Sequence, residues 1–187
     1  MSDRTDELIA YIVHKQGGVK GRVVLAKLVY MVDLEARGWL GHPISTMEYV
    51  RDHGGPYDRA FEEHTEHAKD AVRISWEAVH DYNVCVHEPV GSMPNVSFSP
   101  AERLVIDRTL AEYGGMSRRE LLEDVVYETR PMKGAVGRPV GTPLEMGAED
   151  FALKKKYGID FEQIAASVDE MRAGKRVDVS TLIPPGR

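Results

Sequence analysis

The sequence is poor in several features that would define a biochemical class. It contains a single cysteine, Cys85, among 187 residues, so we expect neither a disulfide framework nor a cysteine-based zinc site. Lysine and arginine number 24 against 30 aspartates and glutamates, for a formal net charge of −6. A general phosphate-binding surface needs clustered cations, so this balance argues against nucleic acid as a partner.

Long apolar runs are also missing. No stretch approaches the roughly 18 apolar residues that a membrane-spanning helix needs, so we expect no membrane contact. The first 16 residues lack a basic segment followed by a long apolar core, and we expect no signal peptide there. The sequence carries no phosphate-binding glycine loop, dinucleotide-binding glycine pattern or hydrolase serine elbow. Together these absences predict a reduced, cytoplasmic protein.

A hydrophobic share of 42% is enough for a core, and the length suits one domain with an appended tail. We expect the chain to be organised around residues 24–57. A dense apolar helix is predicted over residues 21–37 and should end at Gly38, before a turn at Trp39. Lys27, Tyr30 and Asp33 recur at a spacing of three within this helix. That row favours a solvated face on which the lysine lays its alkyl chain over apolar neighbours.

Further elements follow from capping and alternation patterns. Helices are expected over residues 3–16, from Pro56 as first helical residue to 71, after the capping serines Ser99 and Ser117, and over 148–156 and 161–172. Strands are expected over residues 44–51, 72–79 and 84–87, with the last two forming a hairpin that the first joins. The predicted fold class is α+β: a mainly α-helical single domain packed around a small antiparallel sheet of about three strands.

One cluster raises the possibility of metal chemistry. His64 and His67 lie three residues apart on a predicted helix, beside Glu63. Such a pair needs a third ligand, and the histidine spacing of zinc hydrolases is absent. Ordinary helix-surface residues are the favoured interpretation, and a metal-assisted hydrolase is the weaker one. We therefore expect no metal, no cofactor, no catalytic residue and no enzymatic activity.

Several motifs occur in an order typical of one family. The helix carrying Leu28-Val29-Tyr30-Met31 leads through the Trp39 turn to Gly55-Pro56-Tyr57, followed by a hairpin about Trp76 and the helix start at Ser99-Pro100. In this order the chain resembles the Panacea domain of SocA-like antitoxins, also known as a phage-associated protein family. The resemblance implies a domain over residues 1–136. Residues 137–187 are then an extension with two short helices and a loose tail.

The resemblance also implies a function. It would make the chain the antitoxin of a type II toxin–antitoxin system, typical of prophages and phage defence, that neutralises a cognate toxin protein by direct binding. One family member is instead a proteolytic adaptor that delivers its toxin to the ClpXP protease, so a protease unfoldase complex is a second possible partner. Since aromatic anchors dominate many interfaces, the candidate contact residues are Tyr30, Trp39, Tyr49, His53 and Tyr57. Core packing is the alternative for each of them.

Overall fold

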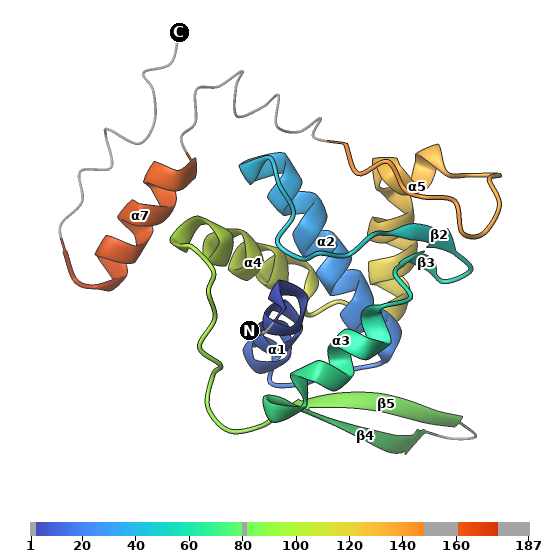
Figure 1. Cartoon of the computed structure of the whole chain (residues 1–187), viewed down its shortest axis with the longest axis horizontal. Helices are drawn as coiled ribbons and strands as arrows, with labels where there is room; N and C mark the ends of the chain where they lie inside the picture. Colours follow the sequence, from blue (N-terminus) through green and yellow to red (C-terminus); the bar gives the residue numbers. More distant parts are fainter. Residues whose placement is uncertain (1–2, 80–81, 148–160, 176–187) are drawn as a thin grey trace, which may run out of the picture.

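The computed structural model describes residues 3–79, 82–147 and 161–175. Helix α2 (Arg22–Leu40) runs through the middle of the fold, in contact with α1 (Arg4–Gln16) and α4 (Pro100–Tyr113) (Figure 1). It is apolar around most of its circumference, as expected for a central helix. The prediction that it ends at Gly38 was wrong. Gly38 is helical and buried, and the helix ends at Gly41, whose φ of 83° supplies the left-handed cap.

The helix starts that carry capping signals are confirmed. Asp3 caps α1 together with Asp6, and Gly17 ends this helix at a φ of 67°. Ser99 caps α4, and Glu102 returns a hydrogen bond to the backbone of Ser99. Each of these caps joins residues that are at most four positions apart. Such local contacts can be predicted from the sequence without knowledge of the tertiary fold.

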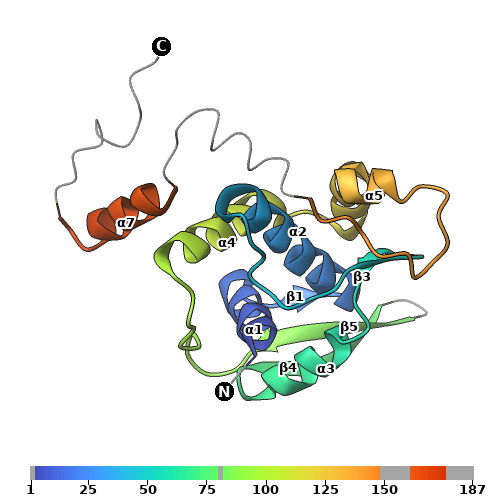
Figure 2. The same ribbon diagram turned by 45° about the horizontal axis from the view of Figure 1, so that its top comes forward.

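The predicted hairpin is also confirmed, as β4 (Val72–Val79) paired with β5 (Tyr82–Pro89). The third strand of this antiparallel sheet is β1 (Val19–Lys20), which pairs with β5 to give the order β1-β5-β4. Figure 2 shows α1 and α2 on one side of this sheet, and both helices contact β5. The expected α+β class is therefore confirmed.

The strand predicted over residues 44–51 was largely wrong. Only its end forms β2 (Val50–Asp52), which pairs with β3 (Gly55–Tyr57) in a separate two-stranded sheet. Residues 44–49 belong to no strand. Ile44 and Ser45 lie in a bend, where their backbone N–H groups donate to the Asp33 carboxylate instead of to a neighbouring strand. The alternation pattern predicted that these donors would pair with a neighbouring strand, but they pair with the side chain of Asp33 on α2.

The helix predicted to start at Pro56 was wrong at its beginning. Pro56 lies inside β3, and α3 (Phe61–His67) begins five residues later, followed by the 3-10 turn η1 (Ala68–Asp70). Gly55, at a φ of 92°, turns the chain into β3. Asp58 then accepts a hydrogen bond from the N–H of Ala60 at 2.9 Å, in a turn that leads into α3.

The later segment is more helical than its proline and glycine content suggests. Ser117 and Glu120 exchange the expected capping bonds, and η2 (Glu120–Val125), a π-helix, and η3 (Val126–Glu128), a 3-10 turn, follow. A short helix, α5 (Arg130–Gly134), then begins one residue before Pro131. Pro131 is tolerated because the first helical turn needs no N–H donor.

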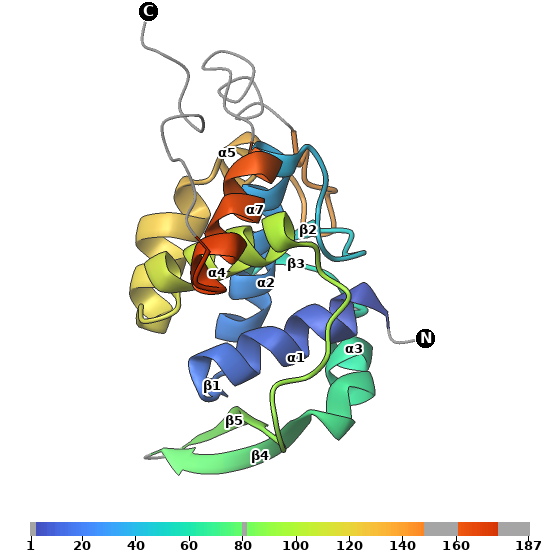
Figure 3. The ribbon, with the colours of Figure 1, turned by 90° about the vertical axis from the view of Figure 1, so that its left-hand side faces the viewer.

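Parts of the predicted extension pack on the domain. The N–H of Arg51 donates to the carbonyl of Thr142 at 2.8 Å, and the N–H of Leu144 donates to the carbonyl of Tyr49 at 2.9 Å. The predicted helix α7 (Phe161–Arg172) is confirmed and contacts α4 (Figure 3). Between them, a guanidinium nitrogen of Arg172 lies 3.9 Å from a carboxylate oxygen of Asp107. The boundary after residue 136 stays a prediction. The helix expected at 148–156 and the tail expected at 177–187 lie outside the described residues. No described helix is long and apolar enough to cross a membrane.

Candidate functional site

The row of Lys27, Tyr30 and Asp33 on α2 is buried, so its interpretation as a solvated face was wrong. Lys27 is 2% exposed, and Tyr30 and Asp33 are 0% exposed. The spacing of three places them on one face of the helix. That face is covered by residues 44–57, which hydrogen-bond Lys27 and Asp33, and by Thr129, which hydrogen-bonds Tyr30. We call these three residues the polar row.

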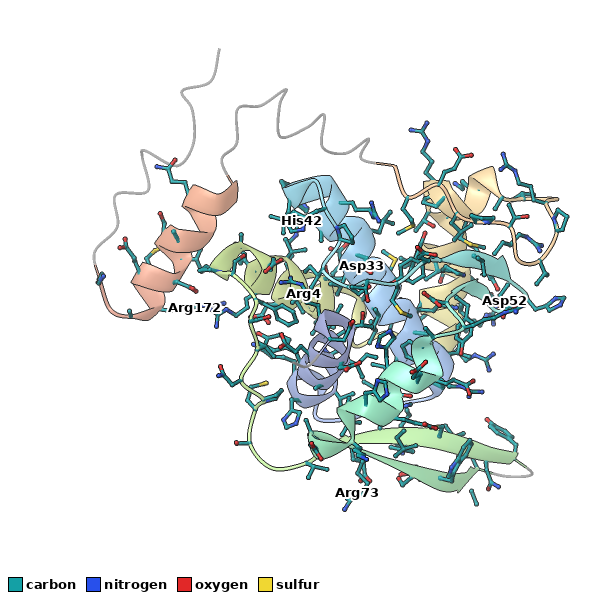
Figure 4. All side chains as sticks on the ribbon, in the orientation of Figure 1. Arg4, Asp33, His42, Asp52, Arg73 and Arg172 are labelled. Atoms are coloured by element: carbon teal, nitrogen blue, oxygen red, sulfur yellow. The ribbon has the colours of Figure 1, made fainter. Side chains whose placement is uncertain are left out.

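Asp33 anchors the connection that follows α2. One carboxylate oxygen accepts hydrogen bonds from the N–H groups of Ile44 at 2.9 Å and Ser45 at 2.8 Å. The other accepts from the hydroxyl of Tyr49 at 2.8 Å and from that of Ser45. Burial raises the pKa of Asp33, and these donors counteract the effect. Figure 4 shows Asp33 inside the body of the molecule, where it holds residues 44–49 against α2.

Tyr30 connects α2 to two segments that lie later in the chain, one at Tyr49 and one at Thr129. Its hydroxyl lies 2.9 Å from that of Thr129, and its ring meets the ring of Tyr49 edge-on, with centroids 5.1 Å apart. Burial raises the pKa of Tyr30 to about 12 and that of Tyr49 well above its usual value. Both hydroxyls therefore stay protonated at neutral pH, and their hydrogen bonds serve packing.

Lys27 holds the β2–β3 hairpin. Its Nζ donates to the carbonyl of Pro56 at 2.5 Å and lies 5.8 Å from the ring centroid of Tyr57. Gly55 packs so closely that an added Cβ would meet Cε of Lys27 at 3.3 Å. Desolvation lowers the pKa of Lys27 to about 8, opposed by the nearby charge of Asp52. A lysine with this pKa can act as a nucleophile, but at 2% exposure it is closed to a substrate, so its role is structural.

The lowered pKa makes stability depend on pH. The folded-state pKa of about 8 lies below the ordinary value of 10.5, so between these values the unfolded chain binds more protons and stability rises with pH. Lys27→Met lacks this titrating group. Between pH 7.5 and 9.5 we therefore expect the unfolding free energy of wild type to rise by about 1–2 kcal/mol relative to that of Lys27→Met. Urea unfolding at several pH values measures it. A difference that stays flat would contradict the burial of this charge.

The structure separates the five predicted contact residues. Tyr30 and Tyr49 lie in the core, Tyr57 is half-buried at the end of β3, and His53 is exposed at the turn between β2 and β3. Trp39 is half-buried at the far end of α2, where its ring lies 4.9 Å from the Arg108 guanidinium. Packing explains Tyr30 and Tyr49 in this conformation. Contact of any of the five with a partner stays a prediction.

Around the β2–β3 hairpin, residues that the sequence did not single out join His53 and Tyr57. Tyr127 is 36% exposed and lies beside Gly55, 3.5 Å from where a Cβ would stand. Val140 is 44% exposed and precedes Gly141, whose N–H donates to the carbonyl of Arg51 on β2 at 2.8 Å. His53, Tyr57, Tyr127 and Val140 are called the hairpin surface. These residues are up to 87 positions apart, from residue 53 to residue 140, so no sequence signal indicated that they lie close together.

A groove of about 550 Å³ adjoins this region. Thr129, Pro131, Ala135 and Pro143 are among the residues that line it, together with Leu34 of α2. Thr129 is also the hydrogen-bond partner of Tyr30, so the groove borders the polar row. It provides a hollow next to exposed apolar side chains, which is a common property of protein-binding surfaces.

The histidine cluster differs from its prediction. Asp6 of α1 joins His64 and His67, with ligand atoms within 4.8 Å of one another. Glu63 is not part of this group; it is largely exposed, and its Oε1 lies 3.9 Å from Nε2 of His67. Nδ1 of His64 lies 2.7 Å from Oδ1 of Asp6. Two ligand atoms on one tetrahedral zinc are roughly 3.3 Å apart, so this pair would have to separate to hold a metal. The contact is a hydrogen bond that ties α3 to α1, and Asp6 was missed because it lies 58 positions away.

Comparison with known proteins places the chain in a family. The family model described as "Antitoxin SocA-like, Panacea domain" matches residues 25–130. Neither the curated proteins nor the solved structures gave a match. The matched range covers more than half of the chain and contains the polar row, the β2–β3 hairpin and Thr129. The chain belongs to the family of SocA-like antitoxins with a Panacea domain.

Proposed function

We propose that this protein is the antitoxin of a type II toxin–antitoxin system and neutralises a cognate protein toxin by binding to it directly. The observation that carries the proposal is the family match over residues 25–130. It is supported by the polar row, whose unusual residues are all engaged in holding the fold together. In this proposal the matched domain serves as a scaffold, and its activity lies in what the surface of that scaffold binds.

The hairpin surface is our candidate for the toxin contact. Tyrosine is enriched among residues that dominate binding energy. This surface presents Tyr57 of β3, whose ring lies near Lys27, and Tyr127, which lies beside Gly55. A hairpin held by buried contacts loses little conformational entropy on binding, which favours affinity. The adjoining groove gives a partner side chain a place to insert.

An adaptor that hands the toxin to a protease such as ClpXP is the alternative, and one growth assay separates the two. The toxin from the adjacent reading frame is expressed with and without this protein, in cells that contain or lack the protease. Direct neutralisation predicts full growth rescue in both strains at an unchanged toxin level. Rescue that disappears with the protease, accompanied by a falling toxin level in the other strain, would support the adaptor instead.

The contact surface is tested with matched variants. We expect His53→Ala combined with Tyr127→Ala to weaken toxin binding at least about tenfold, because both side chains belong to the hairpin surface. His42→Ala combined with Tyr82→Ala removes the same residue types at exposed positions elsewhere and should leave binding unchanged. Titration calorimetry measures the affinity, and circular dichroism checks the fold. Equal affinity for both double variants would exclude the hairpin surface.

A further inference from the structure

The outer edge of strand β4 is open. In the order β1-β5-β4, no described strand pairs with the side of β4 that faces away from β5. Figures 1 and 3 both show β4 at the margin of the molecule. A strand of eight residues with an unpaired edge is a template for another strand, and proteins usually shorten or shield such edges.

The register fixes which main-chain groups point outward. The N–H of Val90 donates to the carbonyl of Ala71 at 2.9 Å, one position beyond the pair Val72–Pro89. Hydrogen-bonded and non-hydrogen-bonded pairs alternate along an antiparallel ladder, so Arg73, Ser75 and Glu77 turn their main-chain groups toward β5. The N–H and carbonyl groups of the residues between them therefore point outward, namely Val72, Ile74, Trp76 and Ala78. The carbonyl of Cys85, opposite Trp76, accordingly points away from β4 and accepts from Gly21 at 2.7 Å.

The side chains along this edge are unusual for a solvent-exposed strand. Trp76 is 65% exposed and Ile74 is 39% exposed, on the same face of the strand. The opposite face carries Arg73 and Glu77, which pair within the sheet with Glu88 at 3.1 Å and Lys20 at 2.7 Å. One face is thus apolar, and the other carries one positive and one negative charge at equal distances from Ser75.

We propose that this edge binds a second copy of the chain, with the two β4 strands antiparallel and Ser75 opposite Ser75. The two three-stranded sheets then become one continuous sheet across a two-fold axis. In this register Arg73 faces Glu77 of the second copy, and Ile74 faces Trp76 of the second copy. The outward main-chain groups of Ile74 and Trp76 meet as a hydrogen-bonded pair. Opposite charges and an aromatic–β-branched contact are both favourable cross-strand neighbours.

Charge complementarity selects the second copy and this register. A two-fold axis perpendicular to the sheet leaves each side chain on the same face of the sheet in both copies. Opposed residues must share a face, so the axis has to pass between a residue and the same residue of the second copy. Centring on Ile74 would place Arg73 opposite Ser75, and centring on Trp76 would place it opposite Val79. Among these three registers, only the one centred on Ser75 places Arg73 opposite Glu77. It also lines up Lys20 and Glu77 of one copy with Arg73 and Glu88 of the other, in a row of alternating charge.

Charge reversal tests the register. Arg73→Glu and Glu77→Arg each place like charges opposite one another in a dimer of identical copies, and each should weaken dimerisation at least about tenfold in analytical ultracentrifugation. The double swap should recover most of the association that each single variant loses, and so should a one-to-one mixture of the two single variants. The pairs with Glu88 and Lys20 stay broken in the double swap, so recovery cannot come from within one chain.

A cross-link tests the same geometry without relying on charge. In a Cys85→Ser background, Ser75→Cys should form a disulfide between two copies under mild oxidation, because opposed residues of a non-hydrogen-bonded pair lie within disulfide reach. Ala78→Cys, which would face Val72, should not form one. A wild-type monomer at all concentrations, or a double swap that fails to recover association, would overturn the proposal. If a monomeric protein lost toxin binding on Trp76→Ala, the edge would belong to the toxin.

Discussion

Replacing Asp33 with alanine should lower the free energy of unfolding by about 3–5 kcal/mol, the largest stability effect that we expect of any single substitution. The carboxylate is fully buried and accepts hydrogen bonds from Ile44, Ser45 and Tyr49. Without it, two backbone N–H groups and two hydroxyls are left buried without this acceptor. A domain of this size is commonly stable by about 5–15 kcal/mol, so the variant should lose a large share of its stability.

Urea unfolding followed by circular dichroism measures the Asp33 effect, and hydrogen exchange at Ile44 and Ser45 locates it. Asp33→Asn should lose less, since the amide oxygen can still accept from the two N–H groups while its NH₂ faces the hydroxyls. Asp70→Ala removes an exposed carboxylate and should stay within about 0.5 kcal/mol of wild type. A loss below about 1 kcal/mol for Asp33→Ala would show that residues 44–49 are not anchored in this way.

The second large effect is expected at Gly55, where alanine should cost about 2–3 kcal/mol. The residue is buried at a φ of 92°, a conformation that L-residues avoid. The new Cβ would also stand 3.3 Å from Cε of Lys27 and 3.5 Å from the Tyr127 ring. Because Lys27 must then move, its hydrogen bond to the Pro56 carbonyl weakens as well.

Gly54→Ala is the matched control for Gly55→Ala. Gly54 is the adjacent residue of the same hairpin, has open space around its Cβ position and does not adopt a positive φ. Its substitution should change stability by less than about 0.5 kcal/mol. If the two alanine variants unfolded at the same urea concentration, the close packing of the hairpin on Lys27 would be contradicted.

The parts of the fold that the sequence predicted well depend on local signals. The caps at Asp3, Ser99 and Ser117 act over three or four residues, and the hairpin of β4 and β5 follows from its alternation and short turn. Residues 44–51 failed because their backbone donors pair with Asp33, a contact across 11 and 12 positions. The start expected at Pro56 failed because the turn there belongs to a hairpin held by Lys27, 29 positions earlier.

The candidate site shows the same limit. The spacing of Lys27, Tyr30 and Asp33 marked one helix face, but spacing does not tell which face of a largely apolar helix is covered. Thr129 is 99 positions from Tyr30, and no sequence signal connects them. Choosing aromatic residues as contacts selected Tyr30 and Tyr49, which are buried, together with His53 and Tyr57, which lie at the hairpin surface.

Mixing the purified protein with its purified toxin, in the absence of any protease, tests the central claim most directly. Residual toxin activity is followed as the protein is added, and the complex is sized by light scattering. Direct neutralisation predicts that activity falls in proportion to the protein added and vanishes at a fixed stoichiometry, together with the formation of a stable complex. Full toxin activity in the presence of excess folded protein, with no complex formed, would contradict the account.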